Sequence, residues 1–130
     1  MRSADAAAVR SLQSLLAYAE PQLVDAAIDG PFVGRVAVDG AIVGYAIAFP
    51  GDEATLSELV VTPNHRRSGY GQALVAAISE RLAADRLFVT TPAENETARR
   101  FYADIGFEVE KRLPEFYADG ANGLRLVRPE

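Results

Sequence analysis

The chain has 130 residues, of which 49% are apolar and 24% are charged, and this composition fits one folded domain over residues 1–130 with its own core. The net charge of −5 argues against general nucleic-acid binding, because such binding requires a basic footprint. The absence of cysteine excludes disulfides and thiolate chemistry, and a single histidine disfavours a metal site made from protein side chains.

The sequence predicts neither a membrane span nor a secretion signal. No apolar run approaches the length that crosses a bilayer, and Asp5 and Arg10 interrupt the N-terminal stretch. We therefore expect a cytoplasmic protein. The basic residues are twelve arginines and one lysine, Lys111. An acidic, lysine-poor composition suits a high-salt cytoplasm, as in a halophile, although GC-rich coding produces the same bias.

The first part of the chain predicts two helices. Leu12, Leu15 and Leu16 lie on the apolar face of a predicted helix over residues 4–18. Pro21 ends that helix or begins a second short one that reaches about residue 28.

An antiparallel meander follows. Residues 32–38 and 41–49 have strand composition, and Asp39-Gly40 between them is a strong hairpin signal. After the turn at Pro50, a third strand is predicted over residues 54–62. The rest of the chain predicts a helix, a strand, a second helix that stops at a glycine, and two closing strands. These elements cover residues 69–84, 86–91, 94–104, 107–112 and 124–128, with Gly106 as the stop.

The sequence NHRRSGYGQAL, residues 64–74, joins the third strand to the next helix. Arg66 and Arg67 stand beside Gly69-x-Gly71 at the point where the helix begins. Free N–H groups, the helix dipole and forked guanidinium donors together suit a bound phosphate. Leu74 replaces the third small residue of a dinucleotide-binding loop, and no Gly-Lys-Ser/Thr tripeptide is present. From these residues alone, a tight turn with solvated arginines is the alternative.

Two blocks of sequence resemble the GNAT superfamily of N-acetyltransferases. LVVTPNHRRSGYG resembles the acetyl-CoA loop of that family, whose signature falls here on Arg66, Gly69 and Gly71. NETARRFYADIGF resembles the second signature, with Asn95 and the aromatic pair Phe101-Tyr102. The resemblance covers about residues 32–127.

This resemblance implies an α+β GNAT fold, with one mixed, mostly antiparallel sheet flanked by helices. Two parallel strands in it splay apart to hold acetyl-CoA, the expected co-substrate, without a metal. The expected anion is then the pyrophosphate of coenzyme A. The expected cofactor-binding residues are Leu59, Val60, Val61, Arg66, Arg67, Ser68, Gly69, Tyr70, Gly71, Gln72, Asn95, Arg99 and Tyr102.

Tyr102 is the expected general acid, because a phenol is protonated at neutral pH and can protonate the departing thiolate. A core tyrosine is the structural alternative. Glu58 is the nearest carboxylate to the predicted centre and is the candidate base, directly or through water. Because side chains alternate along a strand, Glu58 and Ser57 can both face the site only if the strand bulges. Thr90 occupies a position where some relatives place a base.

The end of the chain resembles the branch that acetylates ribosomal proteins and protein N-termini. Phe116-Tyr117 match an aromatic pair that shapes the peptide entrance there, and an ordinary packed hairpin loop is the alternative. We expect the acceptor to be a protein or peptide α-amine. A small-molecule amine, or a non-catalytic module that binds acetyl-CoA, stays open, and the protein is expected to be a monomer or homodimer.

Overall fold

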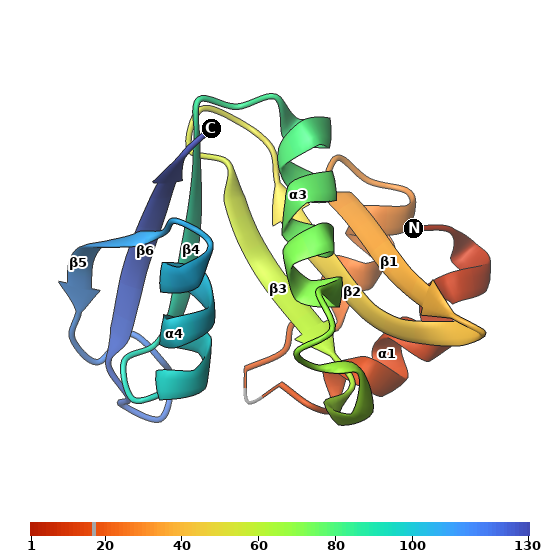
Figure 1. Cartoon of the computed structure of the whole chain (residues 1–130), viewed down its shortest axis with the longest axis horizontal. Helices are drawn as coiled ribbons and strands as arrows, with labels where there is room; N and C mark the ends of the chain where they lie inside the picture. The colour runs from red at the N-terminus through yellow and green to blue at the C-terminus, as the bar shows by residue number, and fades with distance from the viewer. Residues whose placement is uncertain (17) are drawn as a thin grey trace.

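A computed structural model describes residues 1–16 and 18–130 and shows one sheet with helices on both faces (Figure 1). Six strands lie in the order β1-β2-β3-β4-β6-β5. All neighbouring strands are antiparallel except β3 and β4, which are parallel. The predicted α+β fold around one mixed, mostly antiparallel sheet is confirmed.

The element bounds follow the predictions closely, apart from the first helix. The strands are β1 Val33–Asp39, β2 Ala41–Phe49, β3 Thr55–Val61, β4 Arg86–Pro92, β5 Glu108–Leu113 and β6 Gly123–Pro129. The helices are α1 Ala6–Gln13, α2 Gln22–Ile28, α3 Tyr70–Leu82 and α4 Glu96–Asp104, with single turns η1 Ser3–Asp5 and η2 Pro63–His65. Within the described residues, no helix has the length and hydropathy needed to cross a bilayer.

Helix α1 ends five residues before the predicted end at residue 18. The apolar spacing continues through Leu16, but Gln13 turns its side chain into the protein. Its amide nitrogen donates to the carbonyl of Glu20 at 3.2 Å and to the carboxylate of Glu58 at 2.9 Å. These two tertiary hydrogen bonds outweigh the helical preference of the next residues, so the helix ends at Gln13. The part of the predicted helix at residue 17 lies outside the described residues.

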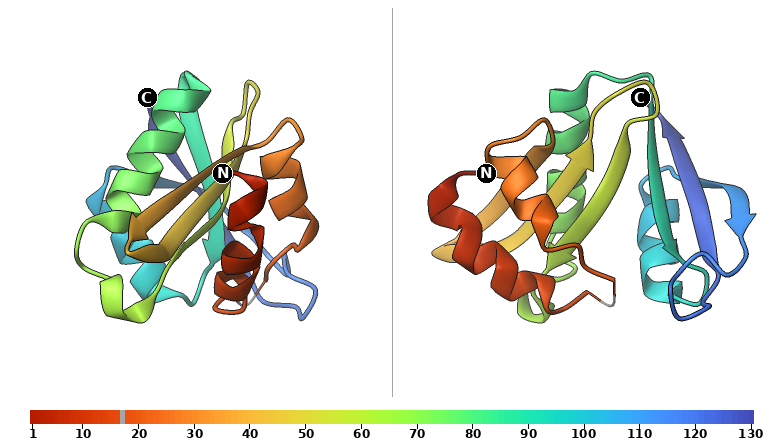
Figure 2. Two further views of the ribbon diagram at one scale, coloured as in Figure 1. Left: turned by 90° about the vertical axis from the view of Figure 1, so that its right-hand side faces the viewer. Right: turned by 180° about the vertical axis from the view of Figure 1, so that it is seen from behind.

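The sheet separates two apolar cores. Helices α1 and α2 cover one face, and α3 and α4 lie on the other (Figure 2). Tyr45, Ile47 and Val60 point toward α1 and α2, whereas Leu56 and Ile78 belong to the core under α3 and α4. The sheet is therefore buried from both sides along its centre.

A bulge in β3 changes which face its side chains occupy. Ala48 of β2 pairs with Leu56, but the preceding Ile47 pairs with Glu58, so Ser57 is an extra residue. Leu56 therefore faces α3, and Glu58 faces the opposite side with Ile47. The bulge decides that Glu58 lies under α1 and α2.

Strands β3 and β4 separate soon after they begin. Their only register partners are Thr55 with Phe88 and Leu56 with Val89. Beyond these pairs, the halves of the sheet diverge as the two arms of a V (Figure 1). The predicted splayed parallel pair is present, and the edge of β3 from Ser57 onward faces the gap.

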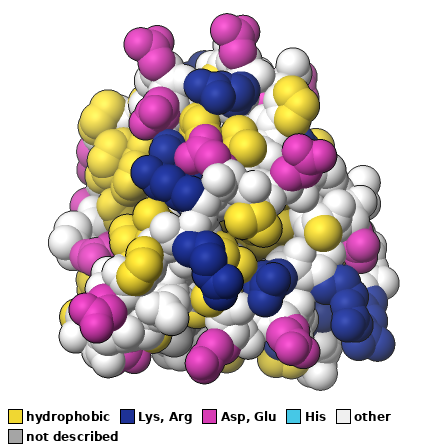
Figure 3. Space-filling view, turned by 90° about the vertical axis from the view of Figure 1, so that its left-hand side faces the viewer, with side chains coloured by type: hydrophobic (Ala, Val, Ile, Leu, Met, Phe, Trp, Pro, Cys, Tyr) yellow, Lys and Arg dark blue, Asp and Glu magenta, His cyan; other side chains and the backbone are white. Residues whose placement is uncertain are grey.

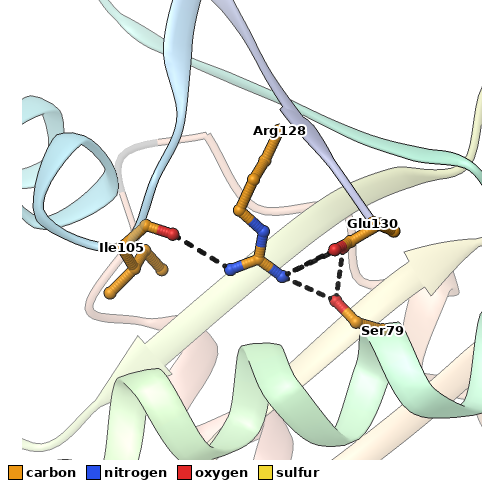
Figure 4. A network of polar contacts seen from close by, with 4 residues as sticks. All are labelled: Ser79, Ile105, Arg128 and Glu130. Atoms are coloured by element: carbon orange, nitrogen blue, oxygen red, sulfur yellow. Dashed lines mark hydrogen bonds and ion pairs between the residues drawn. The ribbon is translucent and has the colours of Figure 1, made fainter.

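An arginine bridge joins the two halves at the closed end of the V. Arg128 of β6 donates to the carbonyl of Ile105 at 3.2 Å, to the hydroxyl of Ser79 on α3 at 2.8 Å, and to Glu130 (Figure 4). Its guanidinium also lies 5.0 Å from the ring centre of Phe107. The bridge spans α3 and the end of α4, so it fixes one end of the V while the other stays open.

Candidate active site

A cleft of about 920 Å³ occupies the open end of the V, between β3 with α3 on one side and α4 on the other. Its walls come from four parts of the chain that the sheet topology brings together. The lining residues are Leu15, Leu16, Leu59, Val60, Val61, His65, Arg66, Arg67, Gly69, Gly71, Gln72, Asn95, Thr97, Ala98, Arg100, Phe101, Tyr102, Asp104 and Ile105.

The loop before α3 forms the basic end of the cleft. Gly69 caps α3 with a φ of 87°, a left-handed conformation that glycine adopts without strain, and Arg67 has a φ of 62°. The first N–H groups of α3 have no partner inside the helix and carry its partial positive charge. Arg66 donates its Nε to the carbonyl of Val61 at 3.0 Å, which fixes the guanidinium beside the end of β3. The geometry suits an anion such as a pyrophosphate.

Gly71 allows α3 and α4 to meet. A Cβ added at Gly71 would lie 3.1 Å from two ring carbons of Phe101, closer than ordinary packing allows. Phe101 packs on the core under α3 and α4 while it also lines the cleft. The sequence predicted that Gly71 contacts the cofactor, and the structure shows that Gly71 also lets α3 pack closely against Phe101 of α4.

His65, at the start of the basic loop, is partly buried. Its Nδ1 lies 2.8 Å from the Thr62 hydroxyl, its Nε2 lies 3.4 Å from a carboxylate oxygen of Asp39, and its ring meets the edge of Tyr70. The contacts tie the basic loop to the tip of the β1–β2 hairpin.

The edge of β3 provides the floor of the cleft. Leu59, Val60 and Val61 all line it, and on their other side they pair with β2. Because β4 has diverged, the backbone groups of this segment that point away from β2 face the gap. Such groups can pair with an extended chain or donate to a developing oxyanion.

Tyr102 reaches the cleft from inside α4. Only 7% of the residue is exposed, and its ring packs edge-on against Phe101 and Phe107 at centre distances of 5.1 and 5.3 Å. No hydrogen bond joins its hydroxyl to another of the described residues, although none of their fully buried side-chain polar atoms lacks a partner. The hydroxyl is therefore directed to the cleft. Burial raises the pKa of Tyr102, and neighbouring Tyr117 adds to the rise, so the phenol stays protonated.

Glu58 does not line the cleft. Its carboxylate is 4% exposed and accepts hydrogen bonds from the Gln13 amide at 2.9 Å, the Tyr45 hydroxyl at 2.8 Å and the backbone N–H of Glu20 at 2.9 Å. Burial, and then the charge of Glu58, raise the pKa of Tyr45, which keeps that hydroxyl a donor. The role of Glu58 as a base stays a prediction, and its position gives it no direct contact with the cleft.

Two expected cofactor-binding residues at α4, Asn95 and Arg99, lie on different sides of the helix. Asn95 lines the cleft and caps α4, accepting the N–H of Ala98 at 3.1 Å. Arg99 instead donates to the carbonyl of Ala93 at 3.1 Å and lines a second hollow on the other side of α4. Arg99 therefore does not line the cleft, and its contact with the cofactor stays a prediction.

The second hollow lies between α4 and strands β5 and β6, with a volume of about 420 Å³. Arg99 and Arg100 line it together with Phe107 and Val109. The side of the molecule that carries β5 shows hydrophobic, basic and acidic side chains intermixed (Figure 3).

The aromatic pair between β5 and β6 meets the connection between α1 and α2. Tyr117 stacks on Tyr18 with ring centres 4.0 Å apart and planes at 17°, and Phe116 lies edge-on to Tyr117. The Tyr18 hydroxyl donates to Asp119 at 2.7 Å. Burial, and then the neighbouring Tyr18, raise the pKa of Tyr117 to about 12. Phe116 itself is 52% exposed, and neither Phe116 nor Tyr117 is among the residues that line the cleft.

The structure gathers most of the predicted cofactor residues around one cleft, with exceptions. Ser68 of the basic loop and Tyr70, the first residue of α3, do not line the cleft. The candidate base position Thr90 lies on β4 opposite Arg125. Sequence reasoning missed Leu15 and Leu16, because their helical spacing indicated a core face. It also missed Tyr18, whose role depends on a contact across 99 residues of chain.

Comparisons with known proteins agree with this arrangement. A family model described as "Acetyltransferase (GNAT) family" matches residues 6–107. An uncharacterized N-acetyltransferase of Mycobacterium bovis is 37% identical over 76 residues, which are 55% of this chain and 49% of that protein. A mycothiol acetyltransferase of Kineococcus radiotolerans is 48% identical over 96 residues, 71% of this chain and 32% of that protein. The chain spans about half the length of the first of these relatives and a third of the second.

Among solved structures, the ribosomal-protein-S18-alanine N-acetyltransferase of Escherichia coli superposes with a TM-score of 0.84. The match covers 99% of this chain and 90% of that chain at 22% identity. At that identity, the likeness shows a shared fold.

Proposed function

Because the chain belongs to the GNAT acetyltransferase family, we propose that it transfers an acetyl group from acetyl-CoA to a primary amine. The observation that carries the proposal is the cleft itself. It joins a basic helix terminus, an unpaired edge of β3 and the buried Tyr102 in one continuous space. These three parts supply anion binding, backbone donors and a proton donor, the groups that transfer from a thioester requires.

We infer that Arg66, Arg67 and the N–H groups at the start of α3 hold the pyrophosphate of coenzyme A. Two guanidinium groups and a helix terminus offset the charge of an anion better than either alone. The edge of β3 at Leu59–Val61 then pairs with the pantetheine arm, and a backbone N–H polarises the thioester carbonyl. Plain apolar side chains suffice here, because the backbone does the chemistry.

Tyr102 is proposed to protonate the departing thiolate of coenzyme A. Its raised pKa keeps the proton on the phenol throughout the physiological range. The same apolar surroundings raise the pKa of the coenzyme A thiol, so the pKa of the acid and the pKa of the leaving group rise together. Tyr102 thus donates a hydrogen bond to sulfur as the bond to the acetyl carbon breaks, and passes its proton along that bond.

A peptide α-amine is the proposed acceptor. Its pKa of about 7.7–8.0 leaves an appreciable neutral fraction at pH 7, whereas a lysine amine has a pKa of about 10.4. The difference is worth roughly 3.5 kcal/mol in supplying the nucleophile, which suits a cleft without Glu58 in its lining. Tyr117 lies close enough to Tyr102 to raise its pKa, so we propose that the Tyr18–Tyr117 stack and Phe116 form the acceptor entrance. The shared fold with the ribosomal-protein-S18-alanine N-acetyltransferase supports the same choice of acceptor.

A small-molecule amine is the second candidate acceptor. The relative named mycothiol acetyltransferase favours it, since its matched segment is 48% identical. That segment is a third of the relative's length. The matched residues therefore say nothing about substrate contacts made by the rest of that relative.

Release of the coenzyme A thiol tests the proposal and separates it from an idle binding module. The protein would be incubated with acetyl-CoA and, separately, N-terminally free peptides, N-terminally blocked lysine peptides and small amines. We expect thiol release that depends on an added amine and is lost in Tyr102→Phe. Tight coenzyme A binding without amine-dependent release would make the protein a binding module.

A further inference from the structure

Glu58 is a buried carboxylate that the proposed transfer does not use. It is 4% exposed, and three groups donate to its two oxygens. Taking a carboxylate out of water is costly unless hydrogen bonds compensate it, so this site is built around the charge. The bulge at Ser57 is what brings the side chain to the α1–α2 side of the sheet.

Two of the three donors come from the two ends of one connection. Gln13 is the last residue of α1, and Glu20 stands just before α2. The Gln13 amide donates to Oε1 of Glu58 at 2.9 Å and to the carbonyl of Glu20 at 3.2 Å, while the N–H of Glu20 donates to Oε2 at 2.9 Å. One carboxylate therefore pins both ends of the connection.

The pinned connection carries part of the cleft. Leu15 and Leu16 line it, and Leu15 is 46% exposed. Tyr18 follows, stacked on Tyr117 and hydrogen-bonded to Asp119. The wall of the entrance thus depends on how the connection is held at its two ends.

We propose that Glu58 is a positioning residue for the acceptor: it holds the α1–α2 connection so that Leu15, Leu16 and Tyr18 form one wall of the acceptor entrance. The proposal rests on the acetyl transfer to an amine proposed above. It assigns Glu58 to binding of the amine substrate, with no proton passing through its carboxylate.

Only a carboxylate accepts all three bonds at once. Glutamine at position 58 would present one oxygen and one NH2 group. If the oxygen faced the Glu20 N–H, the NH2 would face the donors of Gln13 and Tyr45, and the reverse placement would oppose Glu20. Glu58→Gln therefore releases at least one end of the connection while it keeps the size of the side chain.

Steady-state kinetics of Glu58→Gln and Gln13→Met test the proposal. Each variant frees an end of the connection, so we expect KM for a peptide acceptor to rise about tenfold, the worth of a lost hydrogen bond to a charged group. We expect KM for acetyl-CoA and the shape of the kcat profile against pH to stay unchanged. Rates would be measured well below the melting temperature of each variant.

Tyr45→Phe is the matched control. Tyr45 and Gln13 donate to the same oxygen, Oε1 of Glu58, but Tyr45 lies on β2, outside the connection. Removing either donor alters the carboxylate in a similar way, and only Gln13→Met also frees the chain. The acceptor KM of Tyr45→Phe should therefore match that of the wild type.

Hydrogen exchange at the backbone amide of Glu20 gives a readout that does not need turnover. For this readout the variant is Glu58→Met, which offers the Glu20 N–H no acceptor in any orientation, and we expect exchange at Glu20 to be about tenfold faster than in Tyr45→Phe, where the acceptor remains. Equal exchange in the two variants would show that Glu58 does not hold the Glu20 end of the connection.

A collapse of kcat in Glu58→Gln with loss of an enzyme pKa, beside a normal acceptor KM in Gln13→Met, would overturn the positioning role of Glu58 and make it a base. If the wild type acetylates no amine, the proposed function fails, and exchange at Glu20 still decides the anchor.

Discussion

Tyr102→Phe removes one oxygen atom from the cleft and nothing else. The ring keeps its edge-on contacts with Phe101 and Phe107, which contribute about 0.5–1.5 kcal/mol each. The hydroxyl has no partner among the other described residues, so its loss leaves no donor or acceptor of theirs unpaired. We therefore expect the free energy of unfolding to change by no more than about 0.5 kcal/mol.

The kinetic effect should be much larger than the effect on stability. A positioned acid is worth roughly 100-fold or more in rate, which corresponds to about 2.7 kcal/mol of barrier. Because burial raises the pKa of Tyr102, the acid stays protonated in the wild type up to at least about pH 10. The wild-type kcat should therefore show no basic limb below that pH.

Single-turnover rates with saturating acetyl-CoA and amine would measure this loss directly, beside thermal melting of the same samples. Tyr102→Ala serves as the packing control, because it removes the ring and should cost about 3–5 kcal/mol of stability. Normal turnover per folded molecule in Tyr102→Phe would refute the role of Tyr102 as the acid and leave it a core residue.

Three further predictions concern the basic loop and the entrance. Arg66→Ala, Arg67→Ala and Gly71→Val should each weaken coenzyme A binding about tenfold or more by calorimetry, and unchanged affinity in all three would remove the loop from the cofactor site. Tyr117→Ala should raise KM for peptide acceptors, and an equal rise in KM for acetyl-CoA would count against an acceptor-specific role. The Tyr18 hydrogen bond lowers the pKa of Asp119, so its stabilising effect is present above the unfolded pKa and fades as the pH falls through the folded value. In Tyr18→Phe the pKa of Asp119, followed by NMR, should rise toward its ordinary value of 3.8, and an unchanged pKa would mean that the contact does not persist in solution.

Local patterns in the sequence were enough to predict the strands and the last two helices. Asp39-Gly40 predicted the hairpin, and Gly40 has the expected positive φ of 76°. Gly106 ends α4 with a φ of 100°. These features depend on backbone conformations that few residues adopt, so they can be read from single positions.

The position of Glu58 could not be predicted, because it depends on where β3 bulges. The bulge is set by pairing with β2, and strand alternation alone leaves both faces open. The end of α1 was missed for a similar reason, since Gln13 leaves the helix pattern to bond with Glu58 and Glu20. Of the three residues at α4 that we expected near the cofactor, Asn95 and Tyr102 line the cleft, whereas Arg99 lines the second hollow.

A pair of peptides distinguishes an α-amine acceptor from a lysine side chain. One has a free N-terminus, and the other has the same sequence with a blocked N-terminus and an internal lysine. The initial rate of acetylation would be measured for both from about pH 6 to about pH 9 with saturating acetyl-CoA. We predict turnover of the free peptide that rises with pH to about 8 as the α-amine loses its proton, and little turnover of the blocked one. Equal or faster acetylation of the blocked peptide, or turnover of a small amine alone, would contradict the account.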